Sequence, residues 1–497
     1  MGAPHGRRDS QMTLPQPISL EALAKRAGAS VRGGAAVAIR DLAYDTRAAT
    51  PGSLFFCIPG LRADGHDFAV AAVAAGAVAL VCERPVAADV PQLLVPSVRD
   101  AMGPISAVAF GEPSRAMTLA GITGTNGKTT TAFLIEQCFA ALGMTTGLLG
   151  TIETHVAGAI EAAGRTTPES VDLQRTLARM RAAGVTGAAM EVSSHGLAMG
   201  RVDGVWYASA TFTNLTQDHL DFHETMEEYF AAKALLFDPA RAGTAAINAD
   251  DEAGRRLTAL TTLPAVTFGV DHPADVRATD VRMDAAGSSF VCLAPQGRVP
   301  VRVRLAGPFN VSNALAALAT IHALGLDVEK AAAGIEATPG VPGRFERVDG
   351  GRDFTVLVDY AHTPDSVQRV LHAARRICSG RLTIVVGCGG DRDRAKRPLM
   401  GAAAVALADR AILTSDNPRS EEPGAIIADM EQGARETGRT YEVEVDRRAA
   451  ISAAVRDARP GDVIVIAGKG HESGQEFAGR TVPFDDRTVA REELAAR

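Results

Sequence analysis

The chain has 497 residues, which at roughly 150 residues per domain predicts about three domains. Hydrophobic residues make up 46% of it, charged residues 22% and aromatic residues 5%, a composition typical of a globular protein and not of a disordered chain. Lys and Arg total 51 against 58 Asp and Glu, so the formal charge of -7 gives no reason to expect a nucleic acid or an anionic membrane as a partner.

The cysteines and the N-terminal segment indicate the cellular compartment of the protein. The six cysteines are scattered with no C-x-x-C spacing, so we expect reduced thiols in a cytoplasmic protein and neither a disulfide framework nor a zinc site. Residues 1–17 are polar and lack the apolar core of a signal peptide, which predicts a disordered tail. No run reaches the roughly 18 apolar residues that a membrane helix needs.

Short runs rich in Val, Ile, Leu and Ala alternate with longer segments of helical period along nearly the whole chain. This alternation predicts an α/β fold with mainly parallel sheets. One joint is expected near residues 99–115, and a second at 338–343, where two prolines and two glycines (TPGVPG) cannot continue a helix or a central strand. The predicted parts are a tail over 1–17, an N-terminal domain over 18–108, a central domain over 109–342 and a C-terminal domain over 343–497.

A glycine-rich turn follows the expected strand at residues 117–123 and opens a helix. Such a turn favours phosphate because backbone N–H groups and the helix dipole converge on the anion. The first glycine of the common G-x-x-x-x-G-K-[ST] pattern is replaced by Ile122, so the pattern alone leaves open a structural turn with a solvated lysine. We expect Lys128 to reach the β- and γ-phosphates and the Thr129 hydroxyl to ligate Mg²⁺. The residues of the predicted phosphate loop are Gly124, Thr125, Asn126, Gly127, Lys128, Thr129 and Thr130.

Three further polar residues lie in apolar surroundings in the expected central domain. Glu191 interrupts the apolar run at 187–192, and a buried carboxylate is costly unless it is paired, bound to metal or satisfied by backbone donors. His219 lies beside Asp218 in a segment dense in oxygen and imidazole groups, so a metal role and a structural role are both open. Lys233 lies among apolar residues on an expected helix, where snorkelling to solvent is the simple alternative.

Nine motifs occur in order along residues 40–475: GTNGKTT, MEVSSHG, TNLTQDHLDFH with AAKALLF, GPFNVSNALAALA, GRFE, DYAHTPDS, GCGGDRD, SDNPR and AGKGHE. Together they resemble the Mur ligase family, and this set is far more specific than a phosphate loop alone. The resemblance implies a three-domain ATP-dependent amide ligase. Its N-terminal domain would hold the UDP part of a substrate, its central domain would bind ATP, and its Rossmann-like C-terminal domain would bring the amino acid.

The resemblance also implies a reaction. The chain is expected to add meso-2,6-diaminopimelate to UDP-N-acetylmuramoyl-L-alanyl-D-glutamate in peptidoglycan synthesis, through an acyl phosphate and with ATP and Mg²⁺ as cofactors. Its partners would then be small-molecule substrates, and we expect a cytoplasmic monomer.

Residue by residue, the resemblance gives the central and N-terminal parts of the site. Thr129, Glu191 and His219 match residues that handle magnesium and the γ-phosphate, while Lys233 matches a lysine that becomes a carbamate and then ligates metal; Lys128 joins them as catalytic. The family often has Gln where this chain has Met199 and Asn where it has Arg165. Asn310, Arg344, Asp359 and His362 match nucleotide contacts. The implied contacts to the UDP-linked substrate are Asp45, Thr46, Leu61, Arg62, Ala63, Thr166, Thr167, Ser193 and Arg201.

In the last third of the chain, four apolar runs each end in a polar or glycine-rich segment. Such ends converge at one edge of an open parallel sheet, although each alone could be a tight turn. One of these segments should start a helix, with Thr363 as N-cap and Pro364 at the first position. By the resemblance, the amino-acid pocket comprises Arg392, Asp416, Asn417, Pro418, Arg419, Gly468 and Glu472.

The choice of amino acid depends on Arg419. Its guanidinium can hold the distal carboxylate of diaminopimelate in two parallel hydrogen bonds, and Glu472 can pair with the distal ammonium. L-Lysine lacks that carboxylate, and a site built to bind such a group rejects an analogue without it by about 10⁴-fold. The alternatives are an L-lysine-adding homologue, a ligase like folylpolyglutamate synthase, and a nucleotide-dependent switch. The motifs DNPR, GCGGDRD, YDTR and GLRADG argue against the folylpolyglutamate synthase. The motifs of Arg419 and Glu472 argue against the switch, which would need no amino-acid pocket.

Overall fold

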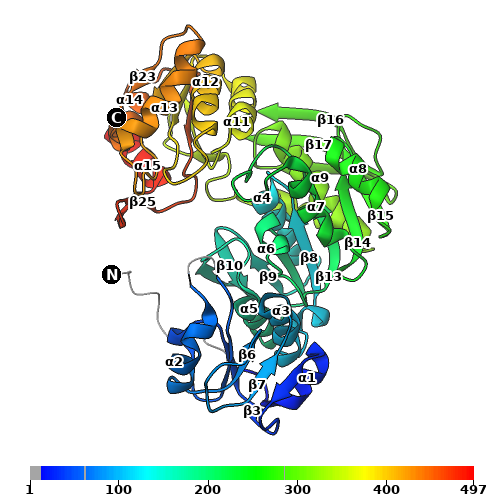
Figure 1. The fold of residues 1–497 in the computed structure, drawn as a ribbon. Helices are drawn as coiled ribbons and strands as arrows, with labels where there is room; N and C mark the ends of the chain where they lie inside the picture. The colour runs from blue at the N-terminus through cyan, green and yellow to red at the C-terminus, as the bar shows by residue number, and fades with distance from the viewer. Residues whose placement is uncertain (1–12, 61–62, 285) are drawn as a thin grey trace. The chain divides into compact units, whose positions relative to one another are not determined.

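The computed structural model describes residues 13–60, 63–284 and 286–497 (Figure 1). The chain forms two compact units. The first comprises Met1–Thr123, Gly143–Ala210 and Ala232–Thr244, and the second comprises Gly124–Leu142, Thr211–Ala231 and Ala245–Arg497. Residues 1–12 of the predicted tail lie outside the described residues, and the predicted domain boundaries stay predictions.

The first unit begins with a five-stranded sheet of order β2-β7-β6-β5-β4. Its residues alternate between two apolar layers, because successive side chains of a strand point to opposite faces. Phe56 packs with helices α1 (Leu20–Ala27) and α3 (Val98–Ala109), whereas Phe55 packs with α2 (Ala69–Ala74). The strands are β2 Ser30–Arg32, β4 Asp41–Ala43, β5 Ser53–Phe56, β6 Ala77–Cys82 and β7 Gln92–Leu94.

The longest sheet has eleven strands in the order β11-β10-β9-β12-β8-β13-β14-β15-β16-β17-β18. In the first unit β9, β12 and β8 run parallel, and Glu191 at the end of β12 is in register with Ile122 of β8. In the second unit β16, β17 and β18 form antiparallel hairpins. The strands are β8 Thr118–Thr123, β9 Thr146–Leu149, β10 Glu153–Val156, β11 Ala159–Ala162, β12 Gly187–Glu191, β13 Tyr207–Phe212, β14 Ala242–Asn248, β15 Ala265–Gly269, β16 Val276–Asp284, β17 Gly287–Ala294 and β18 Gly297–Val303.

The second unit ends in a six-stranded sheet of order β19-β20-β24-β21-β22-β23, in which only the β19 to β20 pairing is antiparallel. Leu357 of β20 packs in the layer of α11, α12 and α13, and its neighbours Val356 and Val358 pack in the layer of α14 and α15. Helices therefore cover both faces, as in a doubly wound α/β fold. The strands are β19 Glu346–Val348, β20 Thr355–Asp359, β21 Leu382–Val386, β22 Arg410–Leu413, β23 Glu442–Val443 and β24 Val463–Ala467.

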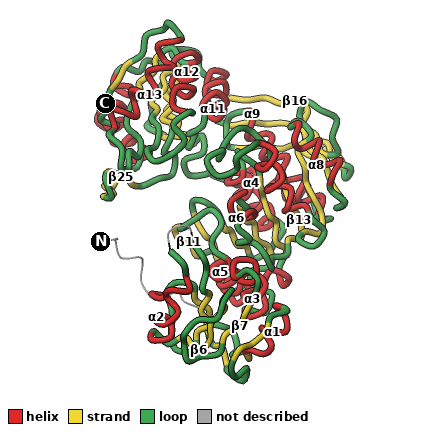
Figure 2. The backbone as a smooth tube through the Cα atoms, viewed as in Figure 1, coloured by secondary structure: helices red, strands yellow, loops and turns green. Residues whose placement is uncertain are grey.

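The helices follow the strands as the sequence predicts (Figure 2). Thr363 caps α11 by accepting from Ser366 N, and Pro364 is the first helical residue, so that prediction is confirmed. The α/β fold class is confirmed as well. The remaining helices are α4 Lys128–Ala141, α5 Ser170–Ala182, α6 Ser194–Ala198, α7 Met226–Ala234, α8 Glu252–Leu260, α9 Pro308–Ala323, α10 Val328–Ala337, α11 Pro364–Ile377, α12 Lys396–Leu407, α13 Pro423–Glu436, α14 Arg447–Arg456 and α15 Asp486–Ala496.

Candidate active site

The phosphate loop lies between the end of β8 and the start of α4, in backbone conformations that demand glycine. Gly124 has φ of 148°, and a Cβ there would lie 1.9 Å from Thr213 Oγ1. Gly127 has φ of 87°, and its Cβ would lie 2.4 Å from Asn313 Oδ1. Both positions thus combine positive φ with close approach of a neighbouring side chain, which only glycine tolerates.

The segment after β13 holds this loop in place. Asn214 O accepts a hydrogen bond from Thr125 N at 2.8 Å, and Asn214 Oδ1 accepts one from Asn126 N at 3.0 Å. Thr213 Oγ1 donates to Asn126 O at 2.6 Å. The TNLT motif therefore sets the shape of the phosphate loop, a role that sequence reasoning did not assign to it.

Two cations face the loop within the second unit. Lys128 Nζ donates to the carbonyl oxygens of Gly124 at 2.9 Å and Thr125 at 2.8 Å. Arg344 Nη2 donates to Thr129 Oγ1 at 3.3 Å. A lysine and an arginine beside a glycine-rich loop can offset charge that builds up on a transferring phosphoryl group.

The predicted nucleotide contacts gather around these cations. Asp359 at the end of β20 accepts from Phe345 N at 2.6 Å and from Ala361 N at 2.8 Å. Burial raises the pKa of Asp359 to about 6, although Arg344 and the two backbone donors oppose the rise. Asp359 thus anchors the segment that carries Arg344.

Asn310 and His362 complete the predicted nucleotide set. Asn310 Oδ1 accepts from Asn313 Nδ2 at 3.1 Å, a bond within α9 that orients the residue packed on Gly127. His362 is bonded through Nδ1 to Tyr360 O at 2.8 Å. Burial lowers the pKa of His362, so a neutral imidazole is favoured near pH 7.

His219 lies beside an acid in a basic environment. Its Nε2 is 3.2 Å from Asp218 Oδ2, and its φ of 54° is in the left-handed region. Burial raises the pKa of Asp218, but the surrounding positive groups, chiefly His219 and His362 and then Lys396 and Lys128, hold it below its usual value. Asp218 therefore remains a carboxylate that can orient an imidazole or accept a cation.

Glu191 and Lys233 lie in the first unit, and both are buried. The Glu191 carboxylate accepts from Thr151 N at 2.6 Å and from Thr151 Oγ1 at 3.0 Å, so it has the backbone donor expected of a structural glutamate. Lys233 in the last turn of α7 is only 1% exposed. The simple snorkelling alternative is therefore wrong for Lys233, because its ammonium does not reach solvent. Among the residues that the structure describes, no group of three or more His, Cys, Asp and Glu forms a metal cage.

Thr167 gathers three of the predicted substrate contacts in the first unit. Its Oγ1 donates to Glu191 O at 3.2 Å and accepts from Ser193 N at 3.0 Å. Its carbonyl oxygen accepts from Arg201 Nη1 at 3.3 Å. Thr166 Oγ1 is 3.0 Å from the hydroxyl of Thr151. Thr166 and Thr167 before α5, Ser193 after β12 and Arg201 after α6 therefore lie together as one group.

The two departures from the family pattern lie in this same group. Arg201 Nη2 contacts Met199 Sδ at 3.4 Å, a sulfur where an amide would offer a stronger acceptor. Arg165 Nη1 donates to Glu169 Oε1 at 3.3 Å. Met199 therefore contacts Arg201 directly, whereas Arg165 contacts Glu169, whose Oε1 lies 3.0 Å from Arg201 Nε.

The expected uridine end is described in part. Asp45 caps a short 3-10 helix, Thr46–Ala48, and pairs with Arg47 at 2.5 Å. Ala63 O accepts from Gly60 N at 3.0 Å. Leu61 and Arg62 lie outside the described residues.

The residues predicted to form the amino-acid pocket make a network of polar and charged pairs at the ends of β22 and β24. Asn417 donates to Glu472 Oε2 at 2.7 Å, and its Oδ1 accepts from Lys469 Nζ at 3.0 Å. Lys469 is fully buried and also contacts Glu472 Oε2 at 2.9 Å. Gly468 has φ of 113°, and a Cβ there would lie 2.4 Å from Asp416 Oδ2.

Arg419 lies beside Pro418 at the edge of this pocket, with φ of 53°. Its Nη1 donates to Gly390 O at 2.7 Å, and its Nε lies 3.3 Å from Glu476 Oε2. Arg392 donates through Nη1 to its neighbour Asp391 at 3.2 Å. The sequence reasoning missed Lys469 and Glu476. Lys469 stands inside the AGKGHE motif and could have been found there, whereas Glu476 lies beyond it and carries no local signal.

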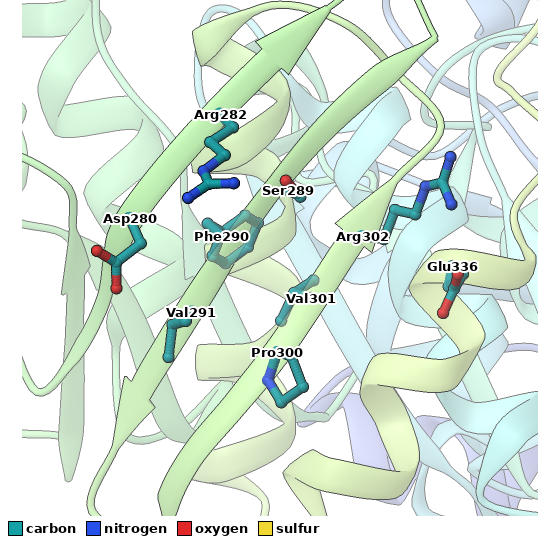
Figure 3. A pocket seen from close by; sticks show the side chains of 9 residues that line it. All are labelled: Asp280, Arg282, Ser289, Phe290, Val291, Pro300, Val301, Arg302 and Glu336. Atoms are coloured by element: carbon teal, nitrogen blue, oxygen red, sulfur yellow. The ribbon is translucent and has the colours of Figure 1, made fainter.

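A pocket of about 430 Å³ lies on the hairpins of β16 to β18, where α10 contributes Glu336 (Figure 3). Arg282, Ser289 and Arg302 are opposite one another across three strands and line it. Its lining includes none of the predicted site residues that the structure describes. We assign it no function.

Comparisons with known proteins identify the family. Models of the Mur ligase family match residues 38–109 (catalytic domain), 122–321 (middle domain) and 343–470 (glutamate ligase domain). The chain belongs to the Mur ligase family. A UDP-N-acetylmuramoyl-L-alanyl-D-glutamate–2,6-diaminopimelate ligase of Streptomyces avermitilis is 49% identical and covers 97% of this chain and 99% of its own length.

Solved structures agree on the fold. A structure of a ligase of the same name has a TM-score of 0.70 at 33% identity and covers 97% of this chain and 99% of that one. A folylpolyglutamate synthase of Mycobacterium tuberculosis, solved with ADP and AMPPCP, has a TM-score of 0.61 at 20% identity over 73% of this chain and 91% of that one. The second likeness supports the fold alone. In the part of the chain that the structure describes, no helix has the length and apolar character to cross a membrane.

Proposed function

We propose that the chain is an ATP-dependent amide ligase that adds meso-2,6-diaminopimelate to UDP-N-acetylmuramoyl-L-alanyl-D-glutamate in peptidoglycan synthesis. The observation that carries the proposal is the 49% identity with a ligase of that name along nearly the full length of both chains. The cluster of Thr166, Thr167, Ser193 and Arg201 and the charged pocket around Arg419 support it, because each offers the polar groups that one of the two substrates requires.

The first half-reaction activates a carboxylate. A carboxylate does not react with an amine in neutral water, so the free side-chain carboxylate of the D-glutamyl residue attacks the γ-phosphorus of ATP and gives an acyl phosphate and ADP. Lys128 and Arg344 stabilise the charge on the phosphoryl group during transfer. The loop from Gly124 to Thr130 holds the remaining phosphates through its backbone.

The second half-reaction forms the amide. The amine of diaminopimelate attacks the acyl carbon, and the tetrahedral adduct expels phosphate. The chain supplies position and charge for this step and no covalent nucleophile. In the pocket, Arg419 holds the distal carboxylate in two parallel hydrogen bonds, while Asn417 and Glu472 hold polar groups of the same amino acid.

Magnesium would fit the oxygen donors of Thr129 and Glu191, a hydroxyl and a carboxylate, whereas the imidazole of His219 is a donor that softer metals prefer. When bound, the ion offsets negative charge on the phosphates. Lys233 is 1% exposed, and it matches the family lysine that becomes a carbamate, a group that would serve as a metal ligand.

This role of Lys233 is testable. Lys233→Ala should lower turnover about 1000-fold, and added bicarbonate should not restore it, since no amine remains to be carbamylated. Steady-state phosphate release measures the effect. Lys330→Ala is the matched control, because Lys330 has a side chain 72% exposed on α10. Normal turnover of the Lys233 variant would remove this residue from the mechanism.

One observation favours a second candidate, an L-lysine-adding ligase. Glu476 lies 3.3 Å from Arg419 Nε, so bound L-lysine would not leave that guanidinium without a partner. The expected preference for diaminopimelate over L-lysine is therefore smaller. Diaminopimelate remains the proposed substrate because of the 49% identical relative.

The direct test is phosphate release by the purified protein with ATP, Mg²⁺, UDP-N-acetylmuramoyl-L-alanyl-D-glutamate and meso-diaminopimelate. We expect release only when all four are present, and omission of any one should return the rate to background. Release that needs neither the UDP-linked substrate nor the amino acid would point to a nucleotide-dependent switch. Cytoplasmic location and a monomeric state remain predictions, as does action on these small molecules without nucleic-acid or membrane partners.

A further inference from the structure

One buried carboxylate in the first unit is shared by three arginines. Glu169 is 8% exposed, and Arg99 Nη1 donates to its Oε2 at 2.6 Å. Arg201 Nε lies 3.0 Å from Oε1, and Arg165 Nη1 donates to the same oxygen at 3.3 Å. Three positive groups around one negative group leave two uncompensated positive charges beside Thr167 and Ser193.

The carboxylate is committed to this cluster and not to its helix. Glu169 occupies the N-cap position of α5, yet its side chain makes no capping hydrogen bond. The residues favoured at this position are Asn, Asp, Ser, Thr and Gly, so a glutamate here leaves its carboxylate available to the arginines.

The arginines are held in place by close backbone packing. Gly103 of α3 lies so near the turn at residues 200–204 that a Cβ would be 2.4 Å from Asp203 O. Gly204 in that turn is equally restricted, since its Cβ would lie 2.9 Å from Gly103 O. This contact fixes α3, which carries Arg99, against the turn that carries Arg201.

Arg201 retains capacity for a ligand. Its Nη1 donates to Thr167 O at 3.3 Å, which is long for a bond to oxygen, and its Nη2 donates at 3.4 Å to the weak acceptor Met199 Sδ. Burial lowers the pKa of Arg201, and Glu169 opposes that shift. Because its present hydrogen bonds are weak, the Arg201 guanidinium would be stabilised by an oxyanion that offers two strong acceptors.

The same helix also reaches the expected uridine end. Asp172 in the first turn of α5 accepts from Tyr44 Oη at 2.5 Å, and Tyr44 is next to Asp45. Arg175, one turn later, donates to Asp41 Oδ1 at 2.9 Å. Through Glu169 and Asp172, the start of α5 therefore contacts Arg201, a predicted substrate contact, and Tyr44, the neighbour of another.

We propose that Glu169 is a positioning residue whose carboxylate gathers Arg99, Arg165 and Arg201 into one site for an oxyanion of the UDP-linked substrate. The inference rests on the proposed function. That substrate offers two oxyanions of suitable charge, its diphosphate and the non-reacting carboxylate of its D-glutamyl residue. Arg99 and Arg165 then contact the substrate together with Arg201, and Glu169 acts through them.

Glu169→Gln tests the proposal through the sign of its effect. The substitution makes the site more positive by one charge, so simple attraction predicts tighter binding of an anion. A positioning role predicts the opposite, because three guanidiniums without their shared carboxylate repel one another and separate. We expect the KM for UDP-N-acetylmuramoyl-L-alanyl-D-glutamate to rise about tenfold, with kcat and the KM for diaminopimelate within about twofold of the wild type. Glu169→Asp should recover part of the loss.

The controls separate positioning from general destabilisation. Glu161→Gln removes another carboxylate of the first unit that accepts from an arginine, Arg179 at 3.1 Å, and it should leave both KM values unchanged. The affinity for AMPPCP should also be unchanged in the Glu169 variant. Arg99→Lys keeps the charge but loses the fork, and it should raise the same KM by severalfold.

Calorimetry with UDP identifies which oxyanion is bound. If Glu169→Gln weakens UDP as much as it weakens the full substrate, the site holds the diphosphate; if UDP is unaffected, it holds the carboxylate. An unchanged or lowered KM in Glu169→Gln would overturn the proposal. Failure of the wild-type protein to release phosphate with this substrate would instead overturn the proposed function.

Discussion

The phosphate loop and the amino-acid pocket are built in different ways. The loop depends on backbone: Gly124 and Gly127 adopt positive φ, and residues 213–214 bond to main-chain atoms of Thr125 and Asn126 between them. The pocket depends on side chains that pair across distant segments, such as Asn417 with Glu472 and Arg419 with Glu476. A side chain added at one of these glycines displaces the backbone of the loop, whereas the loss of one ion pair weakens a network of such pairs only in part.

The largest effect is expected in the loop. Gly124→Ala places a Cβ 1.9 Å from Thr213 Oγ1 at a φ of 148°, so the loop must move. A displacement of about 1 Å can cost about 100-fold in rate, and we expect kcat for phosphate release to fall by at least that factor. Gly143→Ala is the matched control: it also has positive φ, of 79°, but no atom lies within 4 Å of its Cβ. Equal losses in both variants would mean that backbone strain alone, and not loop shape, is responsible.

An intermediate effect is expected in the pocket. Arg419→Lys keeps the charge and loses the planar fork, so the KM for diaminopimelate should rise about tenfold while the KM for ATP stays constant. Initial rates at varied diaminopimelate measure it, with the exposed Arg480→Lys as control. A larger loss in kcat than in KM would contradict a role in holding the ground-state amino acid.

The last effect is on stability and not on rate, and it concerns Asp359, which accepts from Phe345 N next to Arg344. Its pKa is about 6 in the folded protein against 3.8 when exposed, so between these values the folded protein keeps a proton that the unfolded chain releases. Lowering the pH from 7 to 4 therefore stabilises the fold through this group, by about 3 kcal/mol at most. Relative to Asp359→Asn, the melting temperature of the wild type should therefore rise as the pH falls from 7 to 4. Asp353→Asn, an exposed acid before the same strand, should show no such trend, and a parallel course for wild type and Asp359→Asn would refute the assignment.

The same contrast explains what the sequence could predict. The βα alternation, the strand before Gly124 and the helix start at Thr363 and Pro364 all follow from local pattern, and the structure has them. The ion pair between Arg419 and Glu476 and the contacts of Arg99 and Arg201 with Glu169 join segments far apart in the chain. No local spacing encodes such pairs, because they depend on tertiary packing.

Lys233 shows where a local argument fails. An isolated lysine on an amphipathic helix usually extends its stem over apolar surface and keeps its head in water. In the structure Lys233 on α7 is only 1% exposed. This burial depends on tertiary packing, which the local sequence does not show. The roles of the predicted site residues remain predictions until variants are measured.

The central claim is that this chain selects diaminopimelate. An equimolar mixture of meso-diaminopimelate and L-lysine, incubated with the protein, ATP, Mg²⁺ and UDP-N-acetylmuramoyl-L-alanyl-D-glutamate, tests it in one tube when the products are resolved by mass spectrometry. We predict the diaminopimelate adduct in large excess. A lysine adduct in comparable or greater amount would contradict the claim and show that Glu476, by pairing with Arg419, removes the penalty against lysine.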